Sequence, residues 1–253
     1  MSNEIERARA LLGDARRIVI LTGAGVSAES GIPTFRGAGG LWKDFRAEDL
    51  ATPEAFARDP RTVWEWYAWR RELVGTRHPN AAHVAMAQRA LREPNVTIVT
   101  QNVDGLHARA AREAAGGRDP APALPIEVHG SLLRDRCSAC HARSEPVPVN
   151  TASRETLPRC AHCGALLRPD VVWFGEMLDE SALEAADAAA RDADVCLVVG
   201  TSALVHPAAS LPLRTRAGGG IVIEVNPEDT PLTRAAELSI RGKAADVVPQ
   251  LIL

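Results

Sequence analysis

Four short apolar runs spread along the chain constrain its fold more than any other feature of the sequence. Each is rich in valine, isoleucine or leucine, which is typical of a β-strand buried on both faces. Helical patterns over residues 180–192 and 207–217 lie between them. This alternation predicts the α/β class, with a Rossmann-like, doubly wound parallel sheet covered by helices on both faces. The runs occupy residues 17–22, 96–100, 195–199 and 220–225, and further helices are predicted at 4–16 and 244–251.

Two segments interrupt this alternation. Residues 33–80 carry an aromatic-rich helical pattern without a convincing strand, and residues 131–169 carry two cysteine pairs and several prolines. We expect both to be insertions that together form a smaller domain, because neither continues the strand–helix pattern. The predicted boundaries give a discontinuous Rossmann-like domain (1–35, 81–130 and 170–253) and a small domain made of a helical module (36–80) and a cysteine-containing module (131–169).

The composition narrows the choice of ligand and compartment. A chain of 253 residues can bury a core without disulfides, and a net charge of −3 argues against nucleic acid as the main ligand. Residues 1–16 lack the apolar core of a signal peptide, and no apolar run approaches the roughly 20 residues that span a bilayer. We therefore expect a cytoplasmic protein that binds neither nucleic acid nor membrane. The oligomeric state stays open, with a monomer among the options.

Four of the five cysteines form two Cys-x-x-Cys pairs, Cys137 with Cys140 and Cys160 with Cys163. Nineteen residues separate the pairs, a spacing in the zinc-ribbon range, and each pair can supply two thiolates to one tetrahedral ion. Because four thiolates leave no open coordination position, the sequence predicts one structural zinc ion (Zn²⁺) per chain. Cys196 lies in an apolar run and is expected in the core.

The first apolar run ends in Gly23-Ala-Gly-Val-Ser-Ala28, which matches the G-x-G-x-x-G/A dinucleotide fingerprint. The glycines of this motif allow a tight turn and let backbone N–H groups approach a pyrophosphate at a helix N-terminus. A simple packing turn is the alternative. No strand ending in an acidic residue follows about 20 residues later, as it would in an ordinary NAD dehydrogenase. A dehydrogenase is therefore disfavoured, and a bound dinucleotide is expected to be held differently.

Polar residues follow several predicted strands at their carboxyl ends, where parallel α/β sheets bind ligands. Taken singly, each residue can be explained by a purely structural role. Asp104 fits a helix-capping turn, and a lone histidine such as His129 is more often structural than catalytic. Together they favour a ligand site, because these strand ends converge on one edge of the sheet. The segments are residues 101–104, His129 after 126–128, residues 200–202 and residues 226–228.

These motifs together resemble the sirtuin family. The stretch from Gly23 to Gly37 looks like the family signature, and the other segments follow in the family's order from Arg17 to Val248. The resemblance implies NAD-dependent removal of acyl groups from protein lysines, with NAD as co-substrate and with nicotinamide and O-acyl-ADP-ribose as products. It also implies that NAD lies between the two domains. The partners implied are proteins or peptides that carry an acylated lysine.

The resemblance assigns roles to individual residues. His129 and Asn102 would be catalytic, and Asp104 would face the nicotinamide carboxamide. The acylated partner would bind as an extended strand along a strand-like segment, residues 171–176. The NAD-binding residues would be Gly23, Ala24, Gly25, Val26, Ser27, Ala28, Glu29, Pro33, Thr34, Phe35, Arg36, Trp42, Gln101, Asn102, Val103, Asp104, Gly200, Thr201, Ser202, Asn226, Pro227, Glu228 and Ala244, and the substrate-binding residues Ala51, Tyr67, Arg70, Val172, Trp173, Phe174, Gly175 and Glu176.

The implied chemistry requires close positioning and a base. Breaking the nicotinamide bond develops positive charge at the ribose carbon, where the weakly nucleophilic acyl oxygen attacks. The substrate must therefore be placed in advance, with water excluded. His129 would take a proton through the ribose hydroxyls, a task that suits an imidazole with an ordinary pKa of about 6.5.

Tyr67 and Arg70 indicate which acyl group is removed. They share a face of the helical pattern 62–74 at i, i+3 spacing, for which a solvated helix face is the alternative explanation. The pair resembles the Tyr-x-x-Arg acyl-pocket motif of the desuccinylase class, and a guanidinium fork beside a phenol suits a carboxylate. Ala51 would widen the acyl pocket. Succinyl, malonyl and acetyl groups are the expected substrates.

Two other functions stay open at this point. A protein ADP-ribosyltransferase would cleave NAD in the same way, but Tyr67 and Arg70 argue against it. A non-catalytic NAD-sensing zinc-ribbon module is disfavoured because His129 and Asn102 are both present. Detection of a deacylated peptide would separate these functions from a deacylase.

Overall fold

The computed structural model describes residues 2–34, 41–43 and 45–252 and contains the predicted parallel sheet. Its strands are β1 (Ile18–Thr22), β4 (Val96–Thr100), β5 (Ile126–Glu127), β9 (Val195–Val199), β10 (Ile221–Asn226) and β11 (Leu238–Arg241). They lie in the order β11-β10-β9-β1-β4-β5, and neighbouring strands are parallel. The chain order therefore reverses at β1, whose carboxyl end lies beside those of β4 and β9, the place where such sheets bind ligands.

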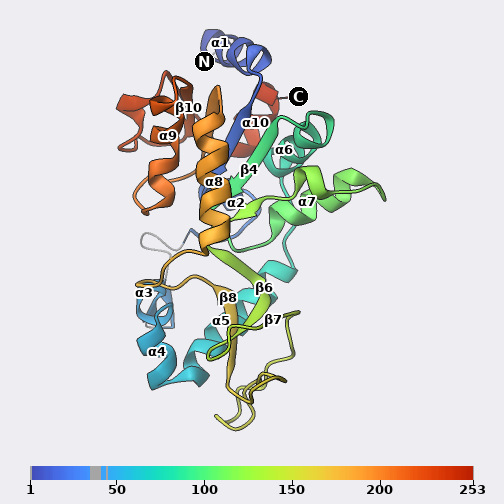
Figure 1. The fold of residues 1–253 in the computed structure, drawn as a ribbon, viewed down its shortest axis with the longest axis vertical. Coiled ribbons are helices and arrows are strands. Elements are labelled where there is room, and N and C mark those ends of the chain that lie inside the picture. Colours follow the sequence, from blue (N-terminus) through green and yellow to red (C-terminus); the bar gives the residue numbers. More distant parts are fainter. Residues whose placement is uncertain (1, 35–40, 44, 253) are drawn as a thin grey trace.

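Helices cover both faces of this sheet because the side chains of each strand alternate between the faces. Ile18 and Ile20 of β1 belong to one buried cluster, and Val19 and Leu21 belong to another. The first cluster includes α1 (Ser2–Asp14), α6 (Ala81–Arg92), α7 (Leu106–Ala115) and α10 (Ala244–Ile252), and the second includes α8 (Glu180–Asp192) and α9 (Leu211–Ala217) (Figure 1). The predicted fold class is confirmed.

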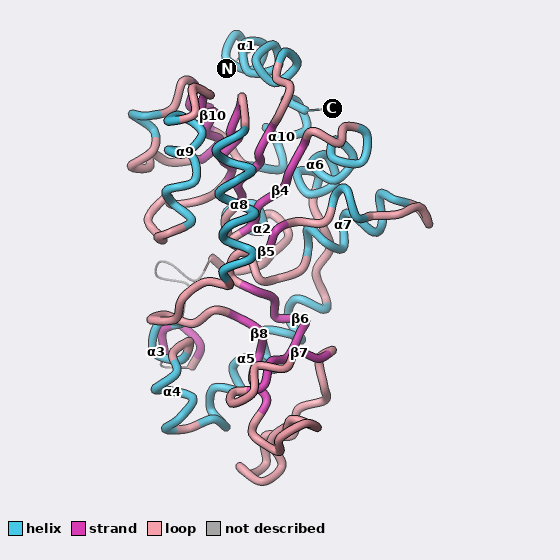
Figure 2. Tube along the Cα trace, viewed as in Figure 1, coloured by secondary structure: helices cyan, strands magenta, loops and turns pink. Residues whose placement is uncertain are grey.

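The two insertions lie together at the other end of the molecule from the chain termini (Figure 2). Their buried cluster includes Trp64, Tyr67, Leu132 and Trp173, and the Trp64 indole donates a hydrogen bond to the carbonyl of Leu167 at 3.0 Å. The predicted domain boundaries themselves stay a prediction. The elements are β2 (Leu41–Trp42), β3 (Phe45–Arg46), α3 (Ala47–Leu50), α4 (Pro53–Arg58), α5 (Pro60–Gly75) and the antiparallel strands β6 (Gly130–Cys137), β7 (Arg143–Ser144) and β8 (Leu167–Val171).

One predicted element is wrong. The strand expected over 171–176 ends at Val171, because the Glu176 carboxylate accepts a hydrogen bond from the Trp173 backbone at 2.9 Å and closes a turn. The helix that the dinucleotide fingerprint places after the first strand is present as the short α2 (Gly25–Ala28). By contrast, the strands predicted at 96–100 and 195–199 are confirmed residue for residue. Of the helices that the structure describes, none has both the length and the apolar character needed to cross a membrane.

Candidate functional site

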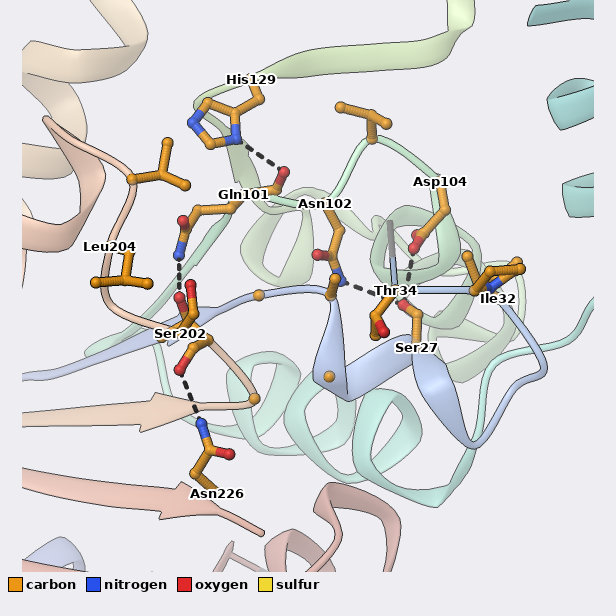
Figure 3. A pocket seen from close by; sticks show the side chains of 18 of the residues that line it. Ser27, Ile32, Thr34, Gln101, Asn102, Asp104, His129, Ser202, Leu204 and Asn226 are labelled. Atoms are coloured by element: carbon orange, nitrogen blue, oxygen red, sulfur yellow. Dashed lines mark hydrogen bonds between the residues drawn. The ribbon is translucent and has the colours of Figure 1, made fainter. Parts of the chain in front are cut away.

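A cavity of about 610 Å³ opens at the carboxyl ends of β1, β4, β9 and β10, and α5 and β6 contribute to its wall (Figure 3). Small-molecule sites usually measure roughly 300–1,000 Å³, so the cavity has room for a nucleotide-sized ligand. The structure therefore brings most of the predicted cofactor residues to one place. The predicted residues that line it are Gly23, Ala24, Gly25, Ser27, Pro33, Thr34, Arg70, Gln101, Asn102, Val103, Asp104, His129, Gly200, Thr201, Ser202, Asn226, Pro227 and Glu228.

Other predicted residues lie outside the lining. Val26 and Ala244 are buried in the core on one side of the sheet, and the Glu29 carboxylate accepts a hydrogen bond from the Ala245 backbone at 3.3 Å. Glu29 thus contacts the start of α10 rather than the cavity. Among the described residues, Val26, Ala28, Glu29, Trp42 and Ala244 are outside the lining, and the predicted residues Phe35 and Arg36 lie outside the part of the chain that the structure describes.

Sequence reasoning missed several lining residues. Asp229, Thr230 and Pro231 continue the strand end at Asn226, so a longer window after β10 would have found them. Leu204 and Val205 follow the strand end at 200–202 in the same way. No sequence signal marks Leu132, because it lies on β6 and reaches the cavity only through the packing of the small sheet.

The glycines of the first turn permit close contact between two strand ends. The Gly25 N–H donates a hydrogen bond to the carbonyl oxygen of Gly200 at 2.8 Å. A Cβ atom on Gly25 would lie 2.8 Å from that oxygen, and one on Gly23 would lie 2.7 Å from the Thr201 Cβ. Both distances are too short for a side chain, so only glycine lets the backbone of β1 meet that of β9 here.

Ser27 joins two polar side chains of the 101–104 segment (Figure 3). Its hydroxyl donates to Asp104 Oδ2 at 2.7 Å and accepts from Asn102 Nδ2 at 3.2 Å. Asp104 Oδ1 accepts from the Leu106 backbone at 2.9 Å, which joins the site to the start of α7, although the N-cap of that helix is Gly105 and not Asp104. Burial raises the pKa of the Asp104 carboxyl, although the bonds from Leu106 and Ser27 oppose the shift.

Two buried histidines lie behind this group. The His83 Nε2 atom is 3.4 Å from the Ser27 hydroxyl, and the His83 ring contacts the His107 ring with centroids 4.7 Å apart. His107 Nε2 is 3.0 Å from the Thr22 hydroxyl. Burial lowers the pKa of His83 to about 4 and that of His107 well below its ordinary value, so both rings are neutral at pH 7.

His129 projects from the start of β6 into the cavity (Figure 3). Its Nδ1 atom is 3.0 Å from the backbone oxygen of Gln101. A carbonyl oxygen only accepts, so Nδ1 carries the proton and the neutral ring has its lone pair on Nε2. The next residue, Gly130, has φ of 78°, and a Cβ there would lie 2.0 Å from the Asp170 oxygen. Gly130 therefore allows β6 to turn immediately after the imidazole.

Side chains also tie neighbouring strand ends together across the cavity floor. Gln101 Nε2 donates to the Thr201 hydroxyl at 3.0 Å, and Asn226 Nδ2 donates to the Thr201 backbone oxygen at 2.8 Å (Figure 3). These bonds join the ends of β4, β9 and β10. The floor is thus held in place before any ligand binds.

The predicted acyl-binding residues lie at the far wall, on α5. Arg70 lines the cavity, and its guanidinium carbon is 4.8 Å from the ring centroid of Trp66 and 5.5 Å from that of Tyr67. Tyr67 is fully buried, and its hydroxyl accepts a hydrogen bond from the Trp173 indole at 2.8 Å. Burial lowers the pKa of Arg70 and raises that of Tyr67. The wall therefore presents the Arg70 cation, and the Tyr67 phenol is buried behind it.

The predicted peptide-binding segment is a loop after β8 and not a strand. The Phe174 N–H donates to the Ala51 carbonyl at 2.9 Å, which links this loop to the C-terminal end of α3. The Glu176 carboxylate pairs with Arg168 at 2.5 Å, so its side chain is already committed to the protein. Phe174 is exposed and Trp173 is buried. The segment thus offers an exposed ring, while the N–H groups of Val172, Trp173 and Phe174 already donate hydrogen bonds within the protein.

The four predicted cysteine ligands form one cluster in the described part of the chain. Their Sγ atoms all lie within 4.8 Å of one another, with Cys137 and Cys163 3.4 Å apart and Cys140 and Cys160 3.7 Å apart. Tetrahedral Zn–S bonds of about 2.3 Å would place sulfur atoms about 3.8 Å apart. The cluster therefore fits a four-thiolate zinc ion, and the prediction of a structural zinc site is supported.

Comparisons with known proteins agree with this geometry. The Sir2 family model matches residues 23–207. The chain is 50% identical over 242 residues to NAD-dependent protein deacylase 1 of Archaeoglobus fulgidus, covering 95% of this chain and 94% of that protein. A Sir2 homologue in complex with NAD superposes with a TM-score of 0.87 at 48% identity, covering 98% and 92% of the two chains. A Sir2 protein bound to an acetylated peptide has a TM-score of 0.82 at 29% identity, covering 98% and 96%.

Proposed function

The chain belongs to the Sir2 family, and on this premise we propose how its cavity carries out NAD-dependent removal of acyl groups from protein lysines. The observation that carries the proposal is the convergence of four strand ends and His129 on one cavity of about 610 Å³. A relative named as an NAD-dependent protein deacylase matches 95% of this chain and is itself covered over 94% of its length. The deacylase activity is therefore assigned to the chain as a whole and not to one part of it. Its substrates are acylated proteins or peptides.

NAD fits the side of the cavity formed by residues 23–27, 200–202 and 226–231, which we call the nucleotide end. Gly23 and Gly25 leave room for backbone N–H groups to approach a pyrophosphate, and Asn226 and Glu228 suit the adenosine half. When bound, NAD supplies an electrophilic ribose carbon as its nicotinamide leaves. The chain itself must hold that carbon against the acyl oxygen and keep water away.

His129 is the proposed general base. Its Nδ1–H donates to the Gln101 carbonyl at 3.0 Å, which orients the ring so that Nε2 is the nitrogen that takes a proton from a ribose hydroxyl. Asn102 and Asp104 are proposed for the nicotinamide side. The Asn102 amide is fixed by its hydrogen bond to the Ser27 hydroxyl. The two carboxylate oxygens of Asp104 accept hydrogen bonds from the Ser27 hydroxyl and the Leu106 N–H.

The acyl group is proposed to enter beside Tyr67, Arg70 and Ala51, which with residues 172–176 form what we call the acyl end. Arg70 is a cavity-lining cation in a buried setting, and such a cation binds a carboxylate more strongly than an exposed one does. Succinyl and malonyl groups carry that carboxylate, and an acetyl group is small enough to share the space. The acylated peptide is proposed to lie extended beside residues 172–175.

The zinc module is proposed to stabilise the acyl end. Cys137 ends β6, and both Cys137 and Cys160 belong to the same buried cluster as Tyr67 and Trp173. A zinc ion held by four thiolates has no position for substrate, so it organises the fold. We expect one zinc ion per chain.

The activity is tested by incubating the protein with NAD and matched succinyl-, malonyl- and acetyl-lysine peptides, followed by mass spectrometry. Free lysine peptide together with O-acyl-ADP-ribose is the expected result. ADP-ribose attached to protein without deacylated peptide would indicate a transferase instead. NAD binding without any product would indicate a non-catalytic NAD sensor.

A further inference from the structure

A buried carboxylate lies directly behind the nucleotide end. Glu224, on β10, is 1% exposed, and its position in the middle of a parallel sheet is unusual for a charged group. Three hydroxyl groups donate to it: Thr230 to Oε1, and Thr233 and Ser239 to Oε2, the last two at 2.7 Å each. Charge-assisted bonds of this kind offset the cost of removing a carboxylate from water.

Arg241 completes this buried group from the neighbouring strand β11. Its Nη1 atom is 3.7 Å from Glu224 Oε2 and donates to the backbone oxygen of Glu228 at 3.1 Å. The other end of the same guanidinium pairs with Asp229. Arg241 therefore connects the buried carboxylate to the backbone and side chains of the segment that follows β10.

The partners of Glu224 are concentrated on one functional segment. Thr230 lines the cavity, and Thr233 begins the short 3₁₀ helix η3 (Thr233–Ala235) that ends this loop. The Thr233 hydroxyl also accepts from the Thr230 backbone at 2.9 Å. In consequence, the part of the 226–231 segment that follows Asn226 is anchored by hydrogen bonds and ion pairs centred on Glu224 and Arg241 rather than by apolar burial, since Pro227, Glu228 and Asp229 are exposed.

We propose that Glu224 is a positioning residue for the adenosine half of NAD. It does not touch the nucleotide. It fixes the shape of the 226–231 segment, so that the nucleotide end is formed before NAD arrives and little ordering is required on binding. This inference rests on the proposed function, because it takes NAD to be the ligand of the nucleotide end.

The decisive variant is Glu224→Gln, which keeps the shape but removes the charge and one acceptor oxygen. Each hydrogen bond to a charged group is worth roughly a tenfold change in an equilibrium constant, so we expect the KM for NAD and the Kd for ADP-ribose to rise about tenfold. At saturating NAD, kcat and the KM for the acyl peptide should stay within about twofold. Hydrogen exchange should become faster in the backbone of 228–233.

Two matched variants separate positioning from simple stability. Thr233→Val and Ser239→Ala each delete one 2.7 Å hydrogen bond to the same oxygen of Glu224, but Thr233 belongs to the loop and Ser239 to β11. Thr233→Val should raise the Kd for ADP-ribose several-fold. Ser239→Ala should lower Tm about as much as Thr233→Val does, and it should leave the Kd for ADP-ribose unchanged. Glu237→Gln removes an exposed charge that pairs with Arg7 and should change neither quantity.

The outcomes are distinguishable. A Glu224→Gln protein that melts earlier but binds ADP-ribose as the wild type does would overturn the proposal, as would equal changes in Kd for Thr233→Val and Ser239→Ala. If Glu224→Gln does not fold, the Thr233 and Ser239 pair still decides. A wild-type protein that binds neither NAD nor ADP-ribose would instead contradict the proposed function on which this inference rests.

Discussion

The nucleotide end and the acyl end of the cavity are built in different ways. At the nucleotide end, the lining comes from strand ends of one parallel sheet, and hydrogen bonds from Gln101 and Asn226 to Thr201 tie these ends together. At the acyl end, the lining comes from α5 through Arg70, Leu73 and Val74, and the loop after β8 is not part of it. Its side chains are held by a separate buried cluster that includes Tyr67 and Trp173.

This difference separates reaction from selectivity. The residues proposed to bind NAD lie on the part of the fold that is fixed by backbone pairing, where small changes are costly. Arg70 and Tyr67, proposed to select the acyl group, lie on a helix outside the parallel sheet, where a helix face can change without altering the sheet. We therefore expect variants of the two ends to give different kinetic signatures.

The largest expected effect is loss of the zinc ion. Chelation or Cys137→Ser should loosen the cluster that carries Tyr67 and Trp173, because zinc binding contributes directly to folding in modules of this kind. Deacylation should disappear and Tm should fall, while metal analysis of the wild type should give one zinc ion per chain. His162→Ala, beside a ligand but not in the cluster, should keep both zinc and activity. Full activity in a zinc-free protein would contradict a structural role.

The second largest effect is expected at His129. His129→Ala should slow deacylation of succinyl and acetyl peptides alike by about 10²–10⁴-fold, since a general base contributes that much. Calorimetry should show that NAD still binds, because His129 is not part of the nucleotide end. Near-normal turnover by the folded variant would remove His129 from the mechanism.

A smaller and more selective effect is expected at the acyl end. Arg70→Met removes a charge-assisted contact worth roughly 1.5–3 kcal/mol, so kcat/KM for succinyl peptides should fall by about 10- to 100-fold. The acetyl group carries no carboxylate, so kcat/KM for acetyl peptides should change little. Tyr67→Phe should show the same asymmetry more weakly and should also lower Tm, because the Trp173 indole loses its acceptor.

The acetyl peptide serves as the control for Arg70, since it reports on folding and NAD use in the same protein. Parallel losses on both peptides would mean that Arg70 only packs against Trp66 and Tyr67.

The smallest effect is expected for the buried His83, whose ring lies behind Ser27, and it concerns the pH dependence of stability. Burial lowers the pKa of His83 to about 4 in the folded protein, so the unfolded chain binds more protons as the pH falls from about 6.5 toward 4. The contribution of His83 to stability is therefore fully present above pH 6.5 and is lost on acidification, by about 2 kcal/mol between pH 7.5 and 5, and His107 contributes in the same direction. Urea unfolding at both pH values measures it. His83→Gln should reduce this pH dependence, whereas the exposed His206→Gln should not; an unchanged dependence in His83→Gln would refute the assignment.

Much of the fold and of the nucleotide end was predictable from local patterns. Buried strands such as 96–100 are apolar throughout, and glycines mark the turn after β1, so these signals do not depend on distant residues. The strand prediction failed where a turn closed by a nearby side chain overrides the apolar pattern. The apolar residues after Val171 suggest a strand, but the Glu176 carboxylate closes a turn and pairs with Arg168.

The sequence by itself determined the parallel sheet, the zinc ligands and the strand-end residues, because each depends on spacing within a short window. Only the tertiary structure decided which of these residues share the cavity. Glu29 faces α10, Tyr67 lies behind Arg70 with its hydroxyl bonded to Trp173, and Leu132 reaches the cavity from the small sheet. In the sequence, Glu224 is one polar residue in an apolar strand. Its proposed role depends on the hydroxyl groups of Thr230, Thr233 and Ser239, which only the fold brings to it. The physical reason is that hydrogen bonds and burial are set by packing between segments far apart in the chain, which no local pattern encodes.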